Sequence, residues 1–313
     1  MVLNKLKHRI PGIWIAVAFL YVISGILSPD TFKVAHILNI FQITAFLGLV
    51  VIGQTIVILT GGIDLSVSGV IMATNILACV TMNGKDENIF MAVLVCLALG
   101  VIVGLVNGIL ISRAKIIPLI VTLSMNSILF GASLLYTGGL PKGSVSEGFA
   151  QIGQGYVLGL PWSMVIWILI TVLAAIILSN TVLGRKIYAI GANPRSAYAA
   201  GINVKNTTAM AYVLSSVSAV FTGLIITAYI NLPSFGIGDP YSLNSIAAVV
   251  VGGTSLAGGI GSVVNSAVGA LFITQLVSLT NMLNISTGGQ YFMQGIIIIV
   301  GVLLSGKLTS KRA

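Results

Sequence analysis

Charge is scarce in this chain, and acids are its scarcest feature. Only six of the 313 residues are Asp or Glu, against fifteen Lys or Arg, and charged residues make up 7% of the whole. Hydrophobic residues make up 57%, and the mean hydropathy is +1.09. A water-soluble domain of this length carries far more surface charge, so the composition excludes that class. It indicates an integral membrane protein.

Cysteine and catalytic motifs are nearly absent as well. The two cysteines, Cys79 and Cys96, fall in apolar segments, which indicates small buried side chains and not a disulfide or a metal pair. No G-x-S-x-G, H-E-x-x-H or C-x-x-C pattern occurs. The segment GVLLSGKL at 301–308 approaches a phosphate-binding loop, but Leu308 replaces the hydroxyl residue of that motif. We therefore expect a protein that is not an enzyme and that holds no metal or cofactor itself.

Long apolar runs dominate the sequence. Runs such as VLVCLALGVIVGLV do not alternate, which favours helices over the strands of a β-barrel. We predict an all-α polytopic membrane protein with about ten transmembrane helices. The predicted spans are 11–28, 37–60, 65–83, 89–111, 116–137, 162–180, 207–230, 242–257, 261–283 and 288–305. No linker divides them, so residues 1–313 are expected to form one transmembrane domain, and the first span, which lacks a convincing cleavage site, is expected to be retained.

The few charges are distributed unevenly over the predicted loops. With the N-terminus inside, the inner segments hold 12 of the 15 basic residues, namely Lys5, Lys7, Arg9, Arg113, Lys115, Arg185, Lys186, Arg195, Lys205, Lys307, Lys311 and Arg312. The outer segments hold Lys33, Lys85, Lys142 and five of the six acids. This distribution follows the positive-inside rule and predicts that both termini are cytoplasmic. The basic residues are spread over several loops, so nothing indicates nucleic-acid binding.

The largest polar segment is Leu183 to Asn206, LGRKIYAIGANPRSAYAAGINVKN, which has four basic residues and no acid. Within it, Asn193 is a favourable helix N-cap, and Pro194 suits the first helical position. Gly201 can end the helix. We predict a short capped helix on a basic cytoplasmic loop, which would be a contact surface for a partner.

Two glycine-rich turns are expected on the same side of the membrane. One is GGIDLSVSG at 61–69, and the other lies within VVVGGTSLAGGIGS at 249–262. Their candidate turn residues are Gly61, Gly62, Gly252, Gly253, Gly258 and Gly259. Asp64 is the one acid outside the outer loops, and we expect it to cap the start of the third span. The alternative is a carboxylate that couples transport to a flow of protons or sodium, but no intramembrane Lys, Arg or His is present to pair with it.

Helix packing can be read from two further patterns. Gly100, Gly104 and Gly108 are spaced by four residues, which permits close contact with another helix, and a contact within the same chain is favoured over a dimer contact. Spans 2–5 and 7–10 would form an inverted repeat in the predicted topology.

Uncharged polar side chains are expected at membrane depth. They are Asn75, Asn107, Asn126, Asn244, Asn265, Gln275 and Gln294. They can line a path for a neutral polar solute, or they can bond to neighbouring helices, and the sequence leaves both readings open. The candidates for a translocation path are Asn75, Asn126, Asn244 and Gln275.

Three ordered segments resemble the permease subunits of ribose-, xylose- and galactose-type ABC importers. They are TIVILTGGIDLSVSG (55–69), LGRKIYAIGANPRSAYAAGINV (183–204) and IAAVVVGGTSLAGGIGS (246–262). The resemblance implies a multi-pass permease of a bacterial or archaeal cytoplasmic membrane that translocates a monosaccharide by alternating access. It implies a homodimer or a heterodimer with a sister permease. It also implies two cytoplasmic ATPase domains, on one or two partner subunits, which hold the ATP and Mg, and an extracytoplasmic sugar-binding protein.

The resemblance also implies roles for particular residues. The ATPase-coupling loop would contain Gly184, Arg185, Gly191, Asn193, Pro194, Arg195 and Gly201. The family often has an acidic residue shortly after the Asn, whereas this chain has Pro194 and Arg195. The outer loops 138–161 and 231–241 would receive the binding protein, with Glu147 and Asp239 available for basic groups. Alternative readings are a permease for a nucleoside, a branched-chain amino acid or a sugar-like signal, an ion-coupled secondary transporter, or a passive channel.

Overall fold

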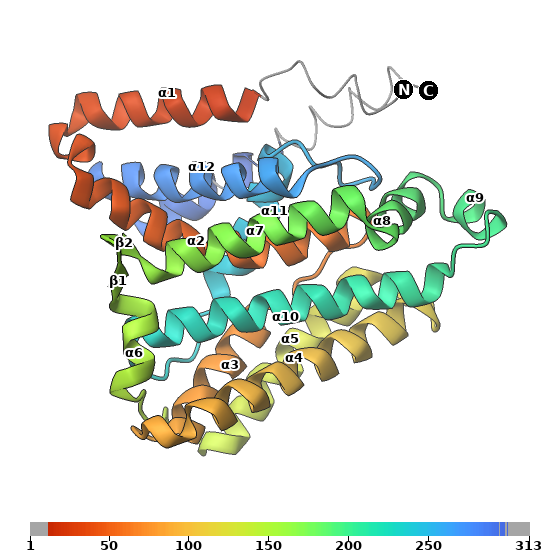
Figure 1. The fold of residues 1–313 in the computed structure, drawn as a ribbon, viewed down its shortest axis with the longest axis horizontal. Helices are drawn as coiled ribbons and strands as arrows, with labels where there is room; N and C mark the ends of the chain where they lie inside the picture. The colour runs from red at the N-terminus through yellow and green to blue at the C-terminus, as the bar shows by residue number, and fades with distance from the viewer. Residues whose placement is uncertain (1–11, 294, 298, 300–313) are drawn as a thin grey trace.

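The computed structural model describes residues 12–293, 295–297 and 299, and these residues are mostly helical (Figure 1). The long helices are α1 (Gly12–Leu27), α2 (Val34–Leu59), α3 (Val67–Met82), α4 (Ile89–Ser112), α5 (Pro118–Thr137), α7 (Trp162–Asn180), α10 (Val204–Ile230), α11 (Asp239–Val251) and α12 (Val263–Met282). Shorter elements are η1 (Pro29–Phe32), η2 (Asp86–Asn88), α6 (Glu147–Gln154), α8 (Val182–Ala192), α9 (Pro194–Ala199) and the antiparallel pair β1 (Tyr156–Val157) and β2 (Leu160–Pro161). Residues 287–293 are also helical.

The helices have the length and composition of membrane spans. Six helical segments of the described chain are long and apolar enough to cross a membrane, and α1 and α3 are shorter apolar helices. The prediction of an all-α polytopic membrane protein is therefore confirmed. The tenth predicted span, 288–305, lies partly outside the described residues, as does Gln294.

The core of the bundle is built around α2 and α10. The apolar window of α2 is 94% buried, and α10 packs against α2, α3 and α4. Glycines allow the closest of these contacts, because a Cβ added at Gly104 would lie 2.4 Å from the Cα of Val213 on α10. Gly100 and Gly108 likewise face α10. The four-residue glycine pattern therefore packs α4 within this chain, as predicted.

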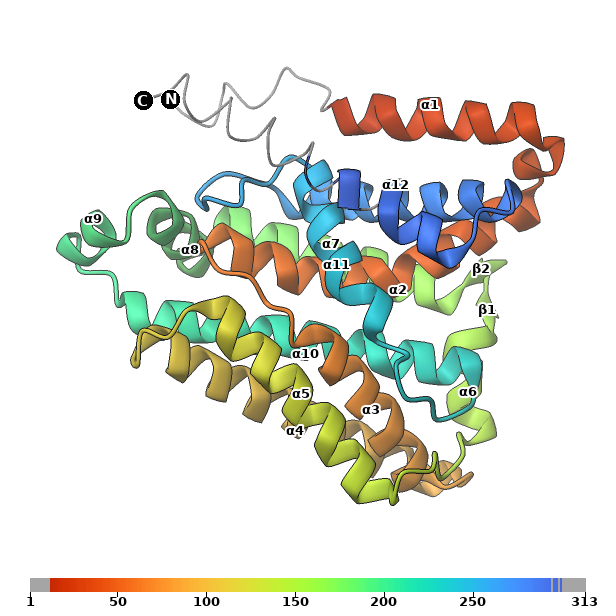
Figure 2. The ribbon, with the colours of Figure 1, turned by 180° about the vertical axis from the view of Figure 1, so that it is seen from behind.

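Two helices begin inside the bundle instead of at one of its ends. Figure 2 shows that the segments before α3 and α11 run back among the other helices before each helix starts. The sixteen residues of α3 and the thirteen of α11 give lengths of about 24 and 20 Å, less than the ~30 Å of a hydrocarbon core. Non-helical backbone is tolerated at such depth where protein surrounds it. The predicted spans 65–83 and 242–257 are thus shorter helices preceded by re-entrant segments.

The two ends of the bundle differ in charge. The end that carries α8 and α9, called here the basic end, has Arg113, Lys115, Arg185, Lys186, Arg195 and Lys205 and no acid among the described residues. The opposite end, called here the acidic end, carries α6 and the β1–β2 hairpin with Asp30, Asp86, Glu87 and Glu147. Lysines share that end, and two of them form exposed ion pairs, Lys33–Asp30 at 2.8 Å and Lys85–Glu87 at 3.6 Å.

Candidate functional site

The short helix predicted in the polar segment is present as α9. The side chain of Asn193 accepts hydrogen bonds from the backbone N–H groups of Arg195 (2.9 Å) and Ser196 (3.0 Å), which caps the helix. Pro194 is the first helical residue, and Gly201 follows the helix with φ +81°. The local sequence therefore accounts for the points at which this helix begins and ends.

The helix α9 projects from the basic end (Figure 1). Of its residues only Ala197 is buried, and Tyr198 is 76% exposed. Arg185, Arg195 and Lys205 are exposed around it. Within the described residues none of these cations forms an ion pair, because both ion pairs lie at the acidic end. The surface is convex and cationic with an aromatic centre, which suits an acidic partner with a groove.

Beneath α9 lies a cluster of backbone contacts, called here the glycine seat, formed by Leu59, Gly61, Gly191, Gly258 and Gly259. A Cβ added at Gly191 would lie 1.8 Å from the Leu59 carbonyl oxygen and 2.3 Å from the Gly259 nitrogen. That same Gly259 N–H donates to the Leu59 carbonyl at 2.9 Å. Gly258 lies against both Gly191 and Gly61. The seat therefore joins the end of α8, the end of α2 and the 252–262 loop with no side chain between them.

Neighbouring contacts hold α8 on both sides of the seat. The Tyr188 hydroxyl donates to the Gly261 carbonyl at 3.0 Å, and burial raises the pKa of this phenol, so it stays a protonated donor. At the other end of α8, a Cβ at Gly184 would lie 2.0 Å from the Leu178 carbonyl oxygen. In the loop, Gly252 packs on the backbone of α12, whereas Gly253 has φ +85° and open space around it. Sequence reasoning identified these segments separately and missed that they meet.

Asp64 lies inside the bundle and is fully buried. Its carboxylate accepts hydrogen bonds from the N–H (2.9 Å) and the hydroxyl of Ser66, the residue that precedes α3. The Ser66 hydroxyl in turn accepts from the Asn107 amide of α4 at 2.9 Å. Asp64 thus fixes the point at which the re-entrant segment becomes helix. The described residues include no cation within ion-pair distance of it.

Two of the polar path candidates are bonded to neighbouring helices. Asn75 is fully buried, donates to Thr227 (2.9 Å) and to the Leu232 carbonyl (3.1 Å), and accepts from the Ser234 N–H (2.7 Å). Gln275 on α12 donates to Ser24 of α1 at 2.9 Å. The geometry favours the helix-bonding reading for both residues. Asn126 and Asn244, by contrast, are only half-buried.

The two acids proposed for an outer docking surface lie apart. Glu147 is exposed as the first residue of α6 at the acidic end. Asp239 is the first residue of α11, and the preceding Gly238 packs against the backbone of Ser68 at the start of α3. Asp239 therefore lies at the inner start of a re-entrant helix, and not beside Glu147.

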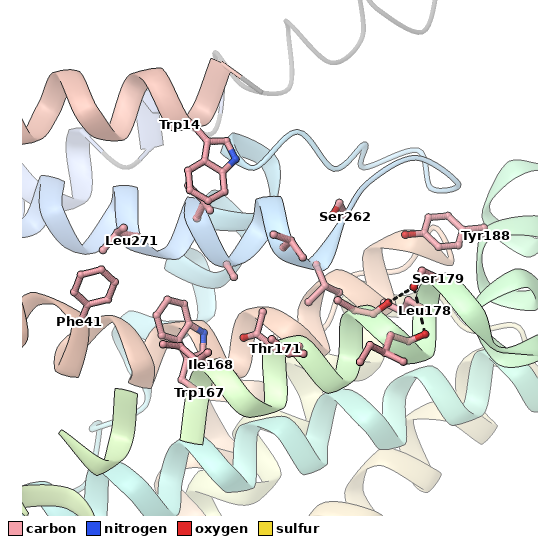
Figure 3. Close-up of a pocket in the computed structure, with 17 residues that line it drawn as sticks. Trp14, Phe41, Trp167, Ile168, Thr171, Leu178, Ser179, Tyr188, Ser262 and Leu271 are labelled. Carbon is pink, nitrogen blue, oxygen red and sulfur yellow. Dashed lines mark hydrogen bonds between the residues drawn. The ribbon is translucent and has the colours of Figure 1, made fainter. Parts of the chain in front are cut away.

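A cavity of about 680 Å³ lies between α1, α2, α7 and α12 (Figure 3). Most of its lining is aliphatic or aromatic, including Trp14, Phe41 and Trp167, and none of the lining residues is charged. The Ser179 hydroxyl already donates to the Ala175 carbonyl at 2.7 Å. Because the lining is mostly apolar, the cavity suits apolar groups better than a polyhydroxylated solute.

Comparisons with known proteins give a consistent result. The family model described as "Branched-chain amino acid transport system / permease component" matches residues 36–302. A ribose import permease of Haemophilus influenzae is 36% identical over 303 residues, covering 96% of this chain and 94% of the relative. A ribose import permease of Bacillus subtilis is 36% identical and covers 95% and 92%. An autoinducer 2 import permease of Salmonella choleraesuis is 31% identical and covers 94% and 84%. No solved structure matches the chain.

Proposed function

Because this chain belongs to the family of branched-chain amino acid transport system permease components, we propose that it is the membrane subunit of an ATP-binding-cassette importer for a ribose-type monosaccharide. The observation that carries the substrate class is the 36% identity to ribose import permeases over almost the whole of both chains. The chain is a transport subunit and not a catalyst, and ATP hydrolysis, with its Mg, belongs to a separate subunit.

We propose that the ATPase subunit binds the basic end at α9. The exposed helix, its flanking cations and Tyr198 supply a contact surface that the rest of the described chain does not use. The departure from the family at Pro194 and Arg195 makes this surface more cationic, so we expect acidic groups in the matching groove of its ATPase. The assembly would hold two permease chains, either identical or sister chains, on two ATPase domains.

The glycine seat supports a mechanism for coupling. When the two ATPase domains close, each displaces the α9 bound to it, and the seat passes that displacement to the end of α2 and to the loop between α11 and α12. Backbone groups in direct contact leave no flexible side chain to absorb the movement. Because α11 is short and begins inside the bundle, a shift of the loop can tilt it without breaking a full-length helix. This is an alternating-access mechanism driven from the basic end.

We propose that the basic end faces the cytoplasm and that the acidic end faces outward. The basic end would be cytoplasmic under the positive-inside rule, with ten spans and both termini inside. The acidic end would face the sugar-binding protein, with Glu147 on its exposed α6 available for basic groups of that partner. The protein would then be a multi-pass component of a bacterial or archaeal cytoplasmic membrane.

The proposal is tested by reconstitution. The chain, its ATPase and its binding protein in proteoliposomes should take up D-ribose only with ATP present. Vesicles with the chain alone serve as the control and should not concentrate the sugar. Uphill uptake by the chain alone, driven by sodium or protons, would refute the assignment. The autoinducer 2 relative makes a sugar-like signal the second candidate. Competition by unlabelled D-ribose and by that signal, with leucine as a third competitor, separates the substrates.

A further inference from the structure

One exposed charge lies at a depth where a lipid-facing charge would be costly. Asp239 begins α11 and is exposed. Within the described residues it has no cation partner, since the ion pairs involve Lys33 and Lys85. Its carboxylate therefore needs either water or a polar ligand.

The depth of Asp239 follows from contacts of α3. Asn75 binds Thr227, which lies about 5 Å along α10 from its last residue at the acidic end. Ser68 lies about 10 Å further inward along α3. A Cβ at Gly238, next to Asp239, would lie 2.0 Å from the Ser68 carbonyl oxygen. Asp239 thus lies about 15 Å below the acidic end, roughly halfway through a hydrocarbon core.

Side chains that suit a sugar surround the same point. The Asn126 carbonyl oxygen on α5 accepts from the Ser68 hydroxyl at 3.0 Å, and no described residue accepts from its amide N–H groups. One turn further along α5, Phe130 meets Phe235 of the re-entrant segment, with ring centroids 6.4 Å apart. Phe130 is 45% exposed. Figure 2 shows α3, α5 and α11 on one side of the bundle.

We propose that Asp239, Asn126 and the Phe130–Phe235 pair form a sugar-binding station at mid-depth on the water-filled path. The carboxylate accepts hydrogen bonds from adjacent sugar hydroxyls, the amide donates to a ring or hydroxyl oxygen, and the aromatic pair covers an apolar sugar face. Charge-assisted hydrogen bonds to hydroxyl groups replace the water that the sugar loses on entering. The station rests on the proposed function for its ligand, but its exposure to water can be tested without any ligand.

The first test measures exposure to water. Asp239→Cys and Leu169→Cys are introduced separately and treated with a membrane-impermeant sulfonated maleimide in the assembled transporter. Leu169 on α7 is 67% exposed and serves as the lipid-facing control. The native Cys79 and Cys96 are fully buried and give a low background. Because maleimide needs a hydrated thiolate, we expect at least a tenfold faster reaction at position 239. Equal rates at the two positions would overturn the proposal.

The second test measures coupling. Asp239→Asn should lower the maximal D-ribose uptake about tenfold, since it weakens charge-assisted hydrogen bonds, while the binding protein still stimulates the ATPase. Asp239→Glu should restore part of the uptake. Normal uptake by Asp239→Asn would overturn the station. Failure of the wild type to take up D-ribose, with fast labelling at 239, would overturn the sugar assignment alone.

Discussion

A single methyl group at Gly191 should displace α8 from the glycine seat and so uncouple the movement of α9 from the rest of the helix bundle. In Gly191→Ala, the new Cβ would lie 1.8 Å from the Leu59 carbonyl oxygen, whereas real Cβ atoms essentially never come within 3.0 Å of such an atom. The end of α8 must therefore move by at least 1.2 Å, the difference between the two distances. The added Cβ would also lie 2.3 Å from the Gly259 nitrogen, so α8 moves away from both partners of the Gly259–Leu59 hydrogen bond and loses its contact with the seat.

The substitution breaks the contact at the glycine seat but costs only part of the free energy of unfolding. Overpacking of this kind costs about 1–3 kcal/mol. That is less than the ~5–15 kcal/mol by which a typical domain is stable. We therefore expect Gly191→Ala to insert and assemble but to lose most of its coupling.

The assay is ATP hydrolysis stimulated by sugar-loaded binding protein, measured in proteoliposomes together with sugar uptake. Gly191→Ala should keep binding the ATPase and lose at least four-fifths of the stimulation, since the affected contact lies behind the docking surface (a loss of fivefold is about 1 kcal/mol). Gly131→Ala on α5 is the control, because nothing lies within 4 Å of its added Cβ. Full stimulation by an assembled Gly191→Ala transporter would refute the role of the seat.

Three further outcomes are expected. Asn193→Ala removes both cap hydrogen bonds of α9 and should weaken ATPase binding about fivefold through the ~1 kcal/mol cost of a lost cap. Asn193→Ser, which keeps a neutral capping side chain, should bind normally in a pull-down titration. Gly104→Val should lower the thermal unfolding temperature in detergent or prevent assembly, because its Cβ would lie 2.4 Å from the Val213 Cα, whereas Gly12→Val, with open space around it, should not. Collapsing the sodium and proton gradients with ionophores should leave ATP-driven uptake unchanged, because Asp64 bonds to Ser66 and no described cation pairs with it. A fall in uptake at constant ATP would instead support a role for Asp64 in coupling transport to protons or sodium.

Sequence patterns that act over a few residues predicted α9 and the glycines by which α4 packs against another helix. An N-cap, a first-turn proline and a terminal glycine act over a few residues, so Asn193, Pro194 and Gly201 predict where the helix begins and ends. The spacing of Gly100, Gly104 and Gly108 places them on one helix face, which is also a local property. The family resemblance came from motifs of the same kind, and the comparisons agree with it.

Long-range geometry was not predictable from the same sequence. Hydropathy identifies apolar segments but does not show how deep in the membrane a helix begins. The start of α11 inside the bundle was therefore missed, and Asp239 was expected at the outer surface. Asn75 and Asn126 looked alike as intramembrane amides, yet one is saturated by protein groups and the other keeps its donors. The contact of Gly191 with Leu59 joins segments far apart in the chain, and no single-sequence pattern encodes that pairing.

At the basic end, the exposed side chains of α9 are free to vary in sequence, whereas the glycines of the seat are not. Side chains on the outer face of α9 make few contacts with their own chain. Exchanging them should therefore change which ATPase binds the permease and leave the packing of the helix bundle unchanged. The glycines beneath cannot be exchanged in the same way, because a Cβ at Gly191 or Gly259 would clash with backbone atoms, and Gly61 and Gly258 have positive φ angles that favour glycine. Transplanting residues 193–201 from a sister permease onto this scaffold should therefore be a workable route to hybrid importers, whereas transplanting the whole of α8 should not.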